Sequence, residues 1–105
     1  MDIMEQIKQQ VEGAPIVLYM KGTPQFPMCG FSARVVDALR AVGAEYDSYN
    51  VLEQPALRAN LPKYADWPTF PQLYVGGELV GGCDIVMSMF ESGDLENIVK
   101  EATPS

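Results

Sequence analysis

Pro15-Ile16-Val17-Leu18-Tyr19-Met20 is a short, continuously apolar run, the pattern of a β-strand that is buried on both faces. It leads into a loop, residues 21–28, that contains two prolines and a glycine. Apolar residues then recur at helical spacing from Cys29 to Val42, and Gly43 ends the pattern. The apolar positions of this expected helix are Phe31, Val35, Val36, Leu39 and Val42. A buried strand, a loop and a helix in this order predict the start of an α/β unit.

The flanking segments extend this unit into a whole fold. We expect a helix over 2–12 that Asp2 caps, a strand over 45–50, a helix over 54–64, a β-hairpin over 72–81 with a Gly-Gly turn, and two short helices after residue 84. Pro62 is expected to loosen or end the third helix, and Asp84 and Asp94 to cap the last two. The order α-β-α-β-α-β-β-α-α predicts a mixed four-stranded sheet with helices on both faces. This is the thioredoxin-like class of α/β fold.

Length and composition favour one globular domain. The chain has 105 residues, of which 48% are hydrophobic and 20% charged, and its formal net charge is −7. The negative charge argues against nucleic acid and anionic membranes as partners. No apolar run is long enough to span a membrane, and the acidic start does not resemble a signal peptide. We therefore expect a cytoplasmic protein.

The chain contains two cysteines and no histidine. Histidine-assisted nucleophilic catalysis and histidine-based metal sites are therefore excluded. Two cysteines are too few for a disulfide framework or for four thiolate ligands from one chain. Any sulfur chemistry must use one or two thiols, with help from outside the chain.

Cys29 lies where the loop becomes a helix. The helix dipole and the free N–H groups of a first turn stabilise a thiolate there, and cysteines at such sites have pKa values of about 3.5–7.5 instead of about 8.5. The alternative is a small buried residue, but a loop rich in proline and glycine is a poor place for burial. Ser32 stands where redox-active relatives of this fold class have a second cysteine. Thiol exchange would therefore need an external thiol, or Cys83 if the fold brings it near.

Three blocks of the sequence resemble one known family. They are Lys21-Gly22-Thr23-Pro24 with Pro27-Met28-Cys29-Gly30-Phe31-Ser32, then Trp67-Pro68-Thr69-Phe70-Pro71-Gln72-Leu73-Tyr74, and Gly77-Glu78-Leu79-Val80-Gly81-Gly82-Cys83-Asp84-Ile85. Together they resemble the monothiol, CGFS-type glutaredoxins in order and spacing. The resemblance covers essentially the whole chain and implies one glutaredoxin domain over residues 1–105, the short form of the family.

The resemblance implies a glutathione site. Lys21 and Arg58 would pair with the glycine carboxylate of glutathione, and Arg58 can do so through two hydrogen bonds. The backbone of Phe70 would bond the middle of the tripeptide like an added strand, and Pro71 would follow a cis peptide bond. Taken alone, Lys21 and Arg58 could equally be solvated surface charges, and Pro71 an ordinary loop proline.

The other end of glutathione would lie at Gly82-Cys83-Asp84. Backbone N–H groups of this turn suit the γ-glutamyl carboxylate, and the Asp84 carboxylate suits the ammonium group. Cys83 has a second interpretation, a small residue packed behind the turn.

Two functions are compatible with such a site. In the first, Cys29 is a ligand of a [2Fe-2S] cluster, and a second chain and two glutathiones complete the four sulfur ligands. The resemblance implies delivery of the cluster to acceptor proteins and partnership with BolA-like proteins. In the second, the chain is a weak glutathione-dependent oxidoreductase in which Cys29 attacks glutathione mixed disulfides. A structural adaptor without thiol chemistry is the least favoured interpretation.

Overall fold

The computed structural model describes residues 2–103. Its elements are α1 (Ile3–Glu12), β1 (Ile16–Met20), α2 (Gly30–Ala41), β2 (Asp47–Asn50), α3 (Pro55–Ala65), β3 (Gln72–Val75), β4 (Glu78–Gly81), α4 (Cys83–Ser92) and α5 (Asp94–Ala102). Their order is the one expected from the sequence. None of the helices in this part of the chain has the length and apolar character needed to cross a membrane.

The strands form one mixed sheet in the order β2-β1-β3-β4. β1 is parallel to β2 and antiparallel to β3, and β3 and β4 form the hairpin. Gly76 and Gly77 connect the hairpin with φ angles of 61° and 82°, which glycine adopts without steric cost. The predicted mixed four-stranded sheet is confirmed.

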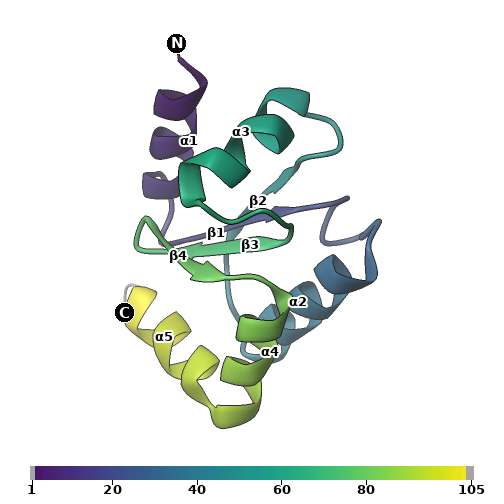
Figure 1. Cartoon of the computed structure of the whole chain (residues 1–105). Helices are drawn as coiled ribbons and strands as arrows, with labels where there is room; N and C mark the ends of the chain where they lie inside the picture. Colours follow the sequence, from purple (N-terminus) through teal and green to yellow (C-terminus); the bar gives the residue numbers. More distant parts are fainter. Residues whose placement is uncertain (1, 104–105) are drawn as a thin grey trace.

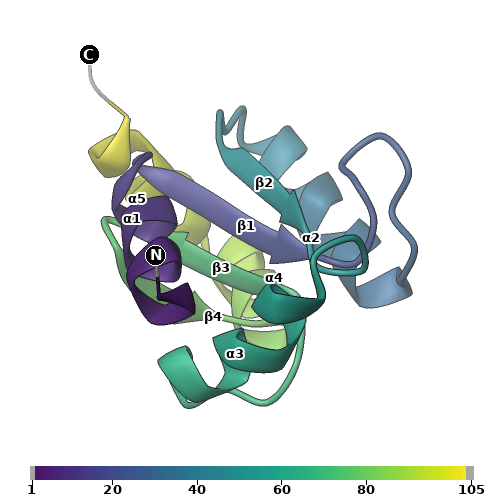
Figure 2. The same ribbon diagram turned by 90° about the horizontal axis from the view of Figure 1, so that it is seen from above.

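Helices cover both faces of the sheet (Figures 1 and 2). α1 and α3 lie on one face, and α2, α4 and α5 on the other. Every residue of β1 is buried, because alternate side chains enter opposite layers of the core. Ile16, Leu18 and Met20 pack in the layer with α2, whereas Val17 and Tyr19 pack in the layer with α1 and α3. This two-sided burial explains the continuous apolar run.

The end of α3 agrees with the expected range to within one residue, whereas the expected caps of α4 and α5 were wrong. α3 continues through Pro62 to Ala65, because the proline lies in the last turns, where its carbonyl still accepts hydrogen bonds from the Asp66 and Trp67 N–H groups. Gly82 is the N-cap of α4 and Gly93 that of α5, so Asp84 and Asp94 cap neither helix. Both aspartates lie in a first turn, where a negative charge still complements the helix dipole. Asp2 does cap α1, as expected, by accepting a hydrogen bond from the Met4 N–H.

Candidate functional site

Cys29 is the N-cap residue of α2, at the end of the loop after β1. The pKa of its thiol is lowered, chiefly because the backbone N–H of Ser32 donates to the sulfur. Burial opposes this effect, whereas the Phe31 N–H, the charge of Lys21 and the Ser32 hydroxyl act with it. The side chain is only partly buried, so the thiolate that these groups favour is accessible.

Ser32 connects the thiol to the central strand. Its side chain is completely buried, and its hydroxyl accepts a hydrogen bond of 3.2 Å from the Lys21 N–H at the end of β1. The serine that replaces a second cysteine therefore fixes the first turn of α2 against the strand. It also supplies two of the donors that act on the Cys29 sulfur.

The loop between β1 and α2 is held by its own hydrogen bonds. The backbone groups of Thr23 and Phe26 bond each other at 3.2 and 3.0 Å, and the Met28 N–H donates to the Lys21 carbonyl at 2.9 Å. Gly22, at φ 94°, donates its N–H to the Asn50 side chain at 2.9 Å. A long connection thus has one defined path that ends at Cys29.

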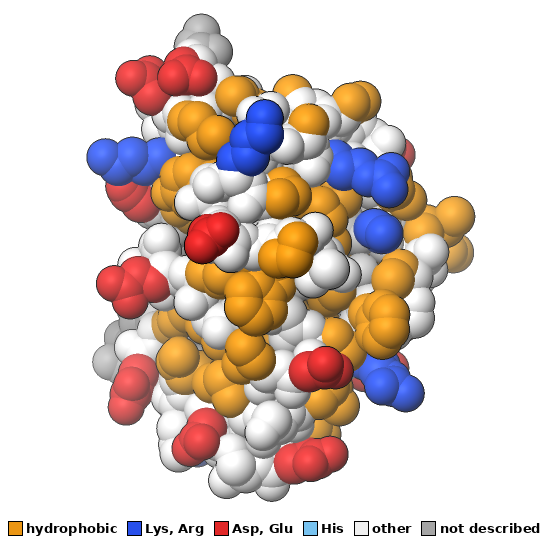
Figure 3. Space-filling view, in the orientation of Figure 1, with side chains coloured by type: hydrophobic (Ala, Val, Ile, Leu, Met, Phe, Trp, Pro, Cys, Tyr) orange, Lys and Arg blue, Asp and Glu red, His pale blue; other side chains and the backbone are white. Residues whose placement is uncertain are grey.

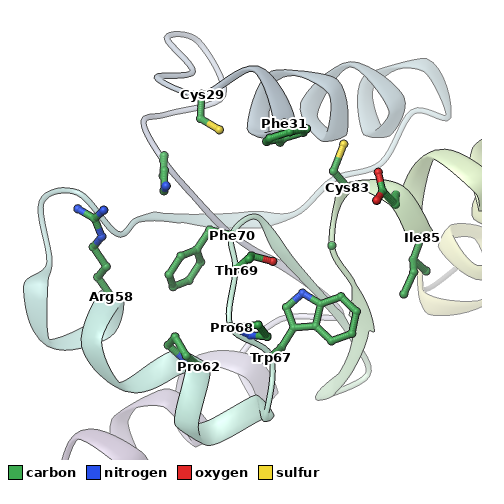
Figure 4. Close-up of a pocket in the computed structure, with 13 residues that line it drawn as sticks. Cys29, Phe31, Arg58, Pro62, Trp67, Pro68, Thr69, Phe70, Cys83 and Ile85 are labelled. Carbon is green, nitrogen blue, oxygen red and sulfur yellow. The ribbon is translucent and has the colours of Figure 1, made fainter.

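A pocket of about 780 Å³ opens beside this thiol (Figure 4). It lies between the start of α2, α3, the 67–71 loop and the start of α4. Its lining residues are Lys21, Cys29, Phe31, Arg58, Pro62, Trp67, Pro68, Thr69, Phe70, Gly82, Cys83, Asp84 and Ile85. Ligand pockets commonly measure about 300–1,000 Å³.

The structure brings seven of the eight predicted site residues to this pocket. They are Lys21, Cys29, Arg58, Phe70, Gly82, Cys83 and Asp84. The eighth, Pro71, is buried behind the lining. The peptide bond between Phe70 and Pro71 is cis, as the resemblance implies. Arg58 lies at one side of the pocket and Cys83 at the other, with Cys29 at its upper edge (Figure 4).

Cys83 differs from Cys29 although it also lies at the start of a helix. It is the first residue of α4, only 8% of its surface is exposed, and it packs in the core beside α2. Burial raises the pKa of its thiol, and the charge of Arg34 opposes the rise. Both cysteines are free thiols. Cys83 therefore combines a packing role with a place in the pocket wall.

Sequence patterns missed the apolar part of the pocket. Phe31 was expected in the core, but its side chain is 57% exposed and lines the pocket, as does Ile85 at 37%. The inward face of α2 is instead Ser32, Val35, Val36 and Leu39, which follows the spacing i, i+3, i+4, i+7. If a serine is accepted as an inward-facing residue, the helical spacing starts at Ser32 and predicts that Phe31 faces outward.

Charged side chains are unevenly distributed over the surface. In the view of Figure 3, acidic groups dominate the lower part, over α4 and α5, and most basic groups lie above and to the right, separated by a band of apolar side chains. Two of the seven basic residues, Lys21 and Arg58, line the pocket. Within residues 2–103 no three Cys, His, Asp or Glu side chains are grouped so that they could hold a metal ion.

A partly exposed thiol at the start of the helix after a central strand, opposite a cis-proline loop, defines a thioredoxin-like thiol protein. More specifically, the chain belongs to the glutaredoxin family, which it matches over residues 16–80. It is 55% identical to glutaredoxin 4 of Escherichia coli (strain K12) over 98 residues, 93% of this chain and 85% of the relative.

Solved structures agree with this assignment. The solution structure of reduced poplar apo GrxS14 is 46% identical, with a TM-score of 0.80 over 93% of this chain and 90% of the other. The crystal structure of a buckwheat glutaredoxin–glutathione complex is 27% identical, with a TM-score of 0.83 over 95% of this chain and 89% of the other.

Proposed function

We propose that this protein is a glutathione-dependent carrier of [2Fe-2S] clusters that uses Cys29 as its cluster ligand. The observation that carries the proposal is a single accessible thiol with a lowered pKa beside a pocket of suitable size for glutathione. A second thiol is absent from the position where exchange chemistry would need it, because Ser32 occupies that position.

Glutathione fits the pocket by charge and shape. Lys21 and Arg58 would bind the glycine carboxylate, the Phe70 backbone the middle peptide unit, and the start of α4 the γ-glutamyl carboxylate. Asp84 is free of a capping role and would accept from the ammonium group. The buckwheat protein that was solved as a glutathione complex has the same fold, which supports this part of the proposal.

The cluster would be cargo shared between two chains. One chain offers one accessible cysteine sulfur, and the glutathione thiol beside it offers a second, so two chains and two glutathiones supply the four ligands of a [2Fe-2S] cluster. Because half of the ligands are held without covalent bonds, such a cluster would be easy to release. Acceptor iron–sulfur proteins and BolA-like proteins are the partners that we infer, in a cytoplasmic setting where thiols stay reduced.

Anaerobic reconstitution with iron, sulfide and glutathione tests the proposal. We expect visible absorption, a shift from monomer to dimer, and loss of both when glutathione is removed. A colourless monomer under these conditions, or a cluster that persists without glutathione, would refute the carrier function.

The two cysteines provide a matched pair of variants. Cys29→Ser should abolish cluster binding, because it removes the accessible ligand. Cys83→Ser is a change of the same size at a buried thiol and should leave most of the binding. The reverse outcome would show that Cys83 is the ligand.

The second candidate function is reduction of glutathione mixed disulfides. It is favoured by the lowered pKa of Cys29, because a thiolate is the attacking species. We expect slow turnover, because the ordered loop before Cys29 restricts the approach of a second glutathione. Fast turnover of a small glutathione mixed disulfide by the cluster-free protein would make this the principal function.

A further inference from the structure

We propose that Trp67, held in place by Gln72, sets the spacing between the two backbone segments of the glutathione site. These segments are the 67–71 loop, which carries the Phe70 backbone, and the 82–84 turn at the start of α4. The inference rests on the proposed function, and it assigns a positioning role to two residues outside the predicted site.

Gln72 is a completely buried polar residue at the start of β3. Its Nε2 donates to the Trp67 carbonyl at 3.0 Å and to the Thr69 carbonyl at 3.3 Å. Its Oε1 accepts from the buried Tyr74 hydroxyl at 2.9 Å. Both donors of the amide are therefore used on the loop that faces the pocket, and its acceptor is anchored in the core.

Only an amide of this length satisfies that arrangement. A carboxylate at position 72 would present acceptors to two carbonyl oxygens, and an apolar side chain would leave both carbonyls without this donor. The hydrogen bonds hold the carbonyl of Trp67 while its indole extends towards the start of α4 (Figure 4).

The indole packs directly against Gly82. A Cβ atom at position 82 would lie 3.2 Å from Trp67 Nε1 and 3.3 Å from the Pro71 carbonyl oxygen. Both atoms belong to the 67–71 loop, so the loop and the turn touch at this point. Gly82 has a φ of −100°, which any residue adopts, so close contact with the indole and the Pro71 carbonyl, and not backbone strain, opposes a side chain there.

Trp67 Nε1 is also buried and has no hydrogen-bond acceptor among residues 2–103. An indole placed only for core packing would normally pair this donor. Its position against Gly82 therefore reflects a requirement for shape: the ring acts as a spacer between the two segments. A tripeptide that bonds both segments binds well only if their separation matches its own length, and small errors in such supporting contacts weaken binding.

The test compares glutathione affinity with stability in paired variants. Gln72→Met keeps the volume of the side chain and removes the bonds to Trp67 and Thr69, and we expect about tenfold weaker glutathione binding, the scale on which residues that orient a binding group act. Gln10→Met is the control, because it also removes one hydrogen bond to a buried tyrosine, at 2.8 Å from Tyr19, but lies on α1 away from the pocket. Calorimetric titration at a temperature where both variants are folded gives the affinities, and thermal unfolding gives the stabilities.

A second variant alters the contact between Trp67 and Gly82 at the glycine. Gly82→Ala should weaken glutathione binding similarly, because its Cβ displaces the indole. Trp67 is the only tryptophan of the chain, so its single indole N–H resonance reports on the junction. We expect that resonance to move in Gln72→Met and Gly82→Ala and to stay in place in Gln10→Met.

The outcomes separate the two proposals. If the wild-type protein does not bind glutathione, the proposed function fails. If it binds, and Gln72→Met and Gly82→Ala bind equally well, the positioning role is overturned while the proposed function stands. Affinity losses in Gln72→Met and Gln10→Met that simply follow equal losses of stability would also overturn it.

Discussion

Cys29 and Cys83 show that a helix start alone does not determine the state of a thiol. Cys29 precedes the first residue of α2, and Cys83 is the first residue of α4, yet the pKa of one thiol is lowered and that of the other raised. The difference lies in the surroundings, because the Cys29 sulfur accepts N–H groups from its own first turn whereas the Cys83 sulfur is buried in the core. Hydrogen bonds to the thiolate favour ionisation, and burial disfavours it.

This difference predicts selective modification of the two thiols. Below the pKa of both thiols neither ionises, and as the pH rises through the lowered pKa of Cys29 its thiolate forms first. At neutral pH we expect iodoacetamide to label Cys29 in the folded protein and to spare Cys83, with one label per chain by mass spectrometry. Cys29→Ser should give almost no label when folded and one when unfolded. Rapid labelling of folded Cys29→Ser would contradict the assigned burial of Cys83.

The loop between β1 and α2 is the element that determines where Cys29 lies. Its path depends on Gly22, whose positive φ and tight surroundings allow no side chain. A Cβ there would lie 2.5 Å from the Phe26 carbonyl oxygen and 2.6 Å from the Met28 nitrogen. Because both neighbours are backbone atoms, neither can move without opening the loop.

Gly22→Ala should therefore destabilise the protein more than another glycine substitution of the same kind. Gly43 provides the control, because its φ is also positive, at 71°, but nothing lies within 4 Å of a Cβ built there. We expect Gly43→Ala to cost about 1–2 kcal/mol for the left-handed conformation, and Gly22→Ala to cost about 3 kcal/mol or more because overpacking is added. Urea unfolding measures the loss of unfolding free energy in both variants. Equal losses would mean that the loop around Gly22 has room for a side chain.

At the scale of elements, regular patterns were predictable and end effects were not. The continuous apolar run of β1 and the Gly-Gly hairpin are local signals that the fold leaves unchanged. The N-caps of α4 and α5 were not predictable, because a glycine, and not the nearby aspartate, takes the cap position of each helix. Phe31 was misplaced because the inward position in its turn is taken by Ser32, whose partner, the Lys21 N–H, lies on another element.

The same reasoning applies to the site. Four of its charged and thiol residues, Lys21, Cys29, Cys83 and Asp84, lie in recognisable blocks, so they could be predicted from the sequence. Gln72 lies within one of these blocks, but its role could not be predicted, because a glutamine at the start of a strand is indistinguishable from a solvated one until its partners are known. Its role depends on the carbonyl groups of Trp67 and Thr69, which face its side chain only after the 67–71 loop folds back towards β3.

At the scale of the whole molecule, the net charge opposes the dimer that the proposed cluster requires. Each chain carries a formal charge of −7, so two chains repel one another at long range. The repulsion falls with salt, because the Debye length is about 10 Å at 0.1 M and about 3 Å at 1 M. Apart from Asp84, the acidic residues of α4 and α5, such as Glu91 and Glu101, contribute to this field without lining the pocket.

We therefore predict that formation of the cluster-bridged dimer, at saturating glutathione, becomes more favourable as salt is added. A double variant, Glu91→Gln with Glu101→Gln, changes two exposed residues and lowers the charge from −7 to −5. It should form more dimer than the wild type at low salt and show a weaker salt dependence, because the repulsion between chains scales with the product of their charges. Sedimentation at several salt concentrations measures the dimer fraction, and the cluster-free protein, which should stay monomeric throughout, is the control. A dimer fraction that falls with added salt in both the wild type and the double variant would mean that local ion pairs across the interface outweigh the long-range repulsion.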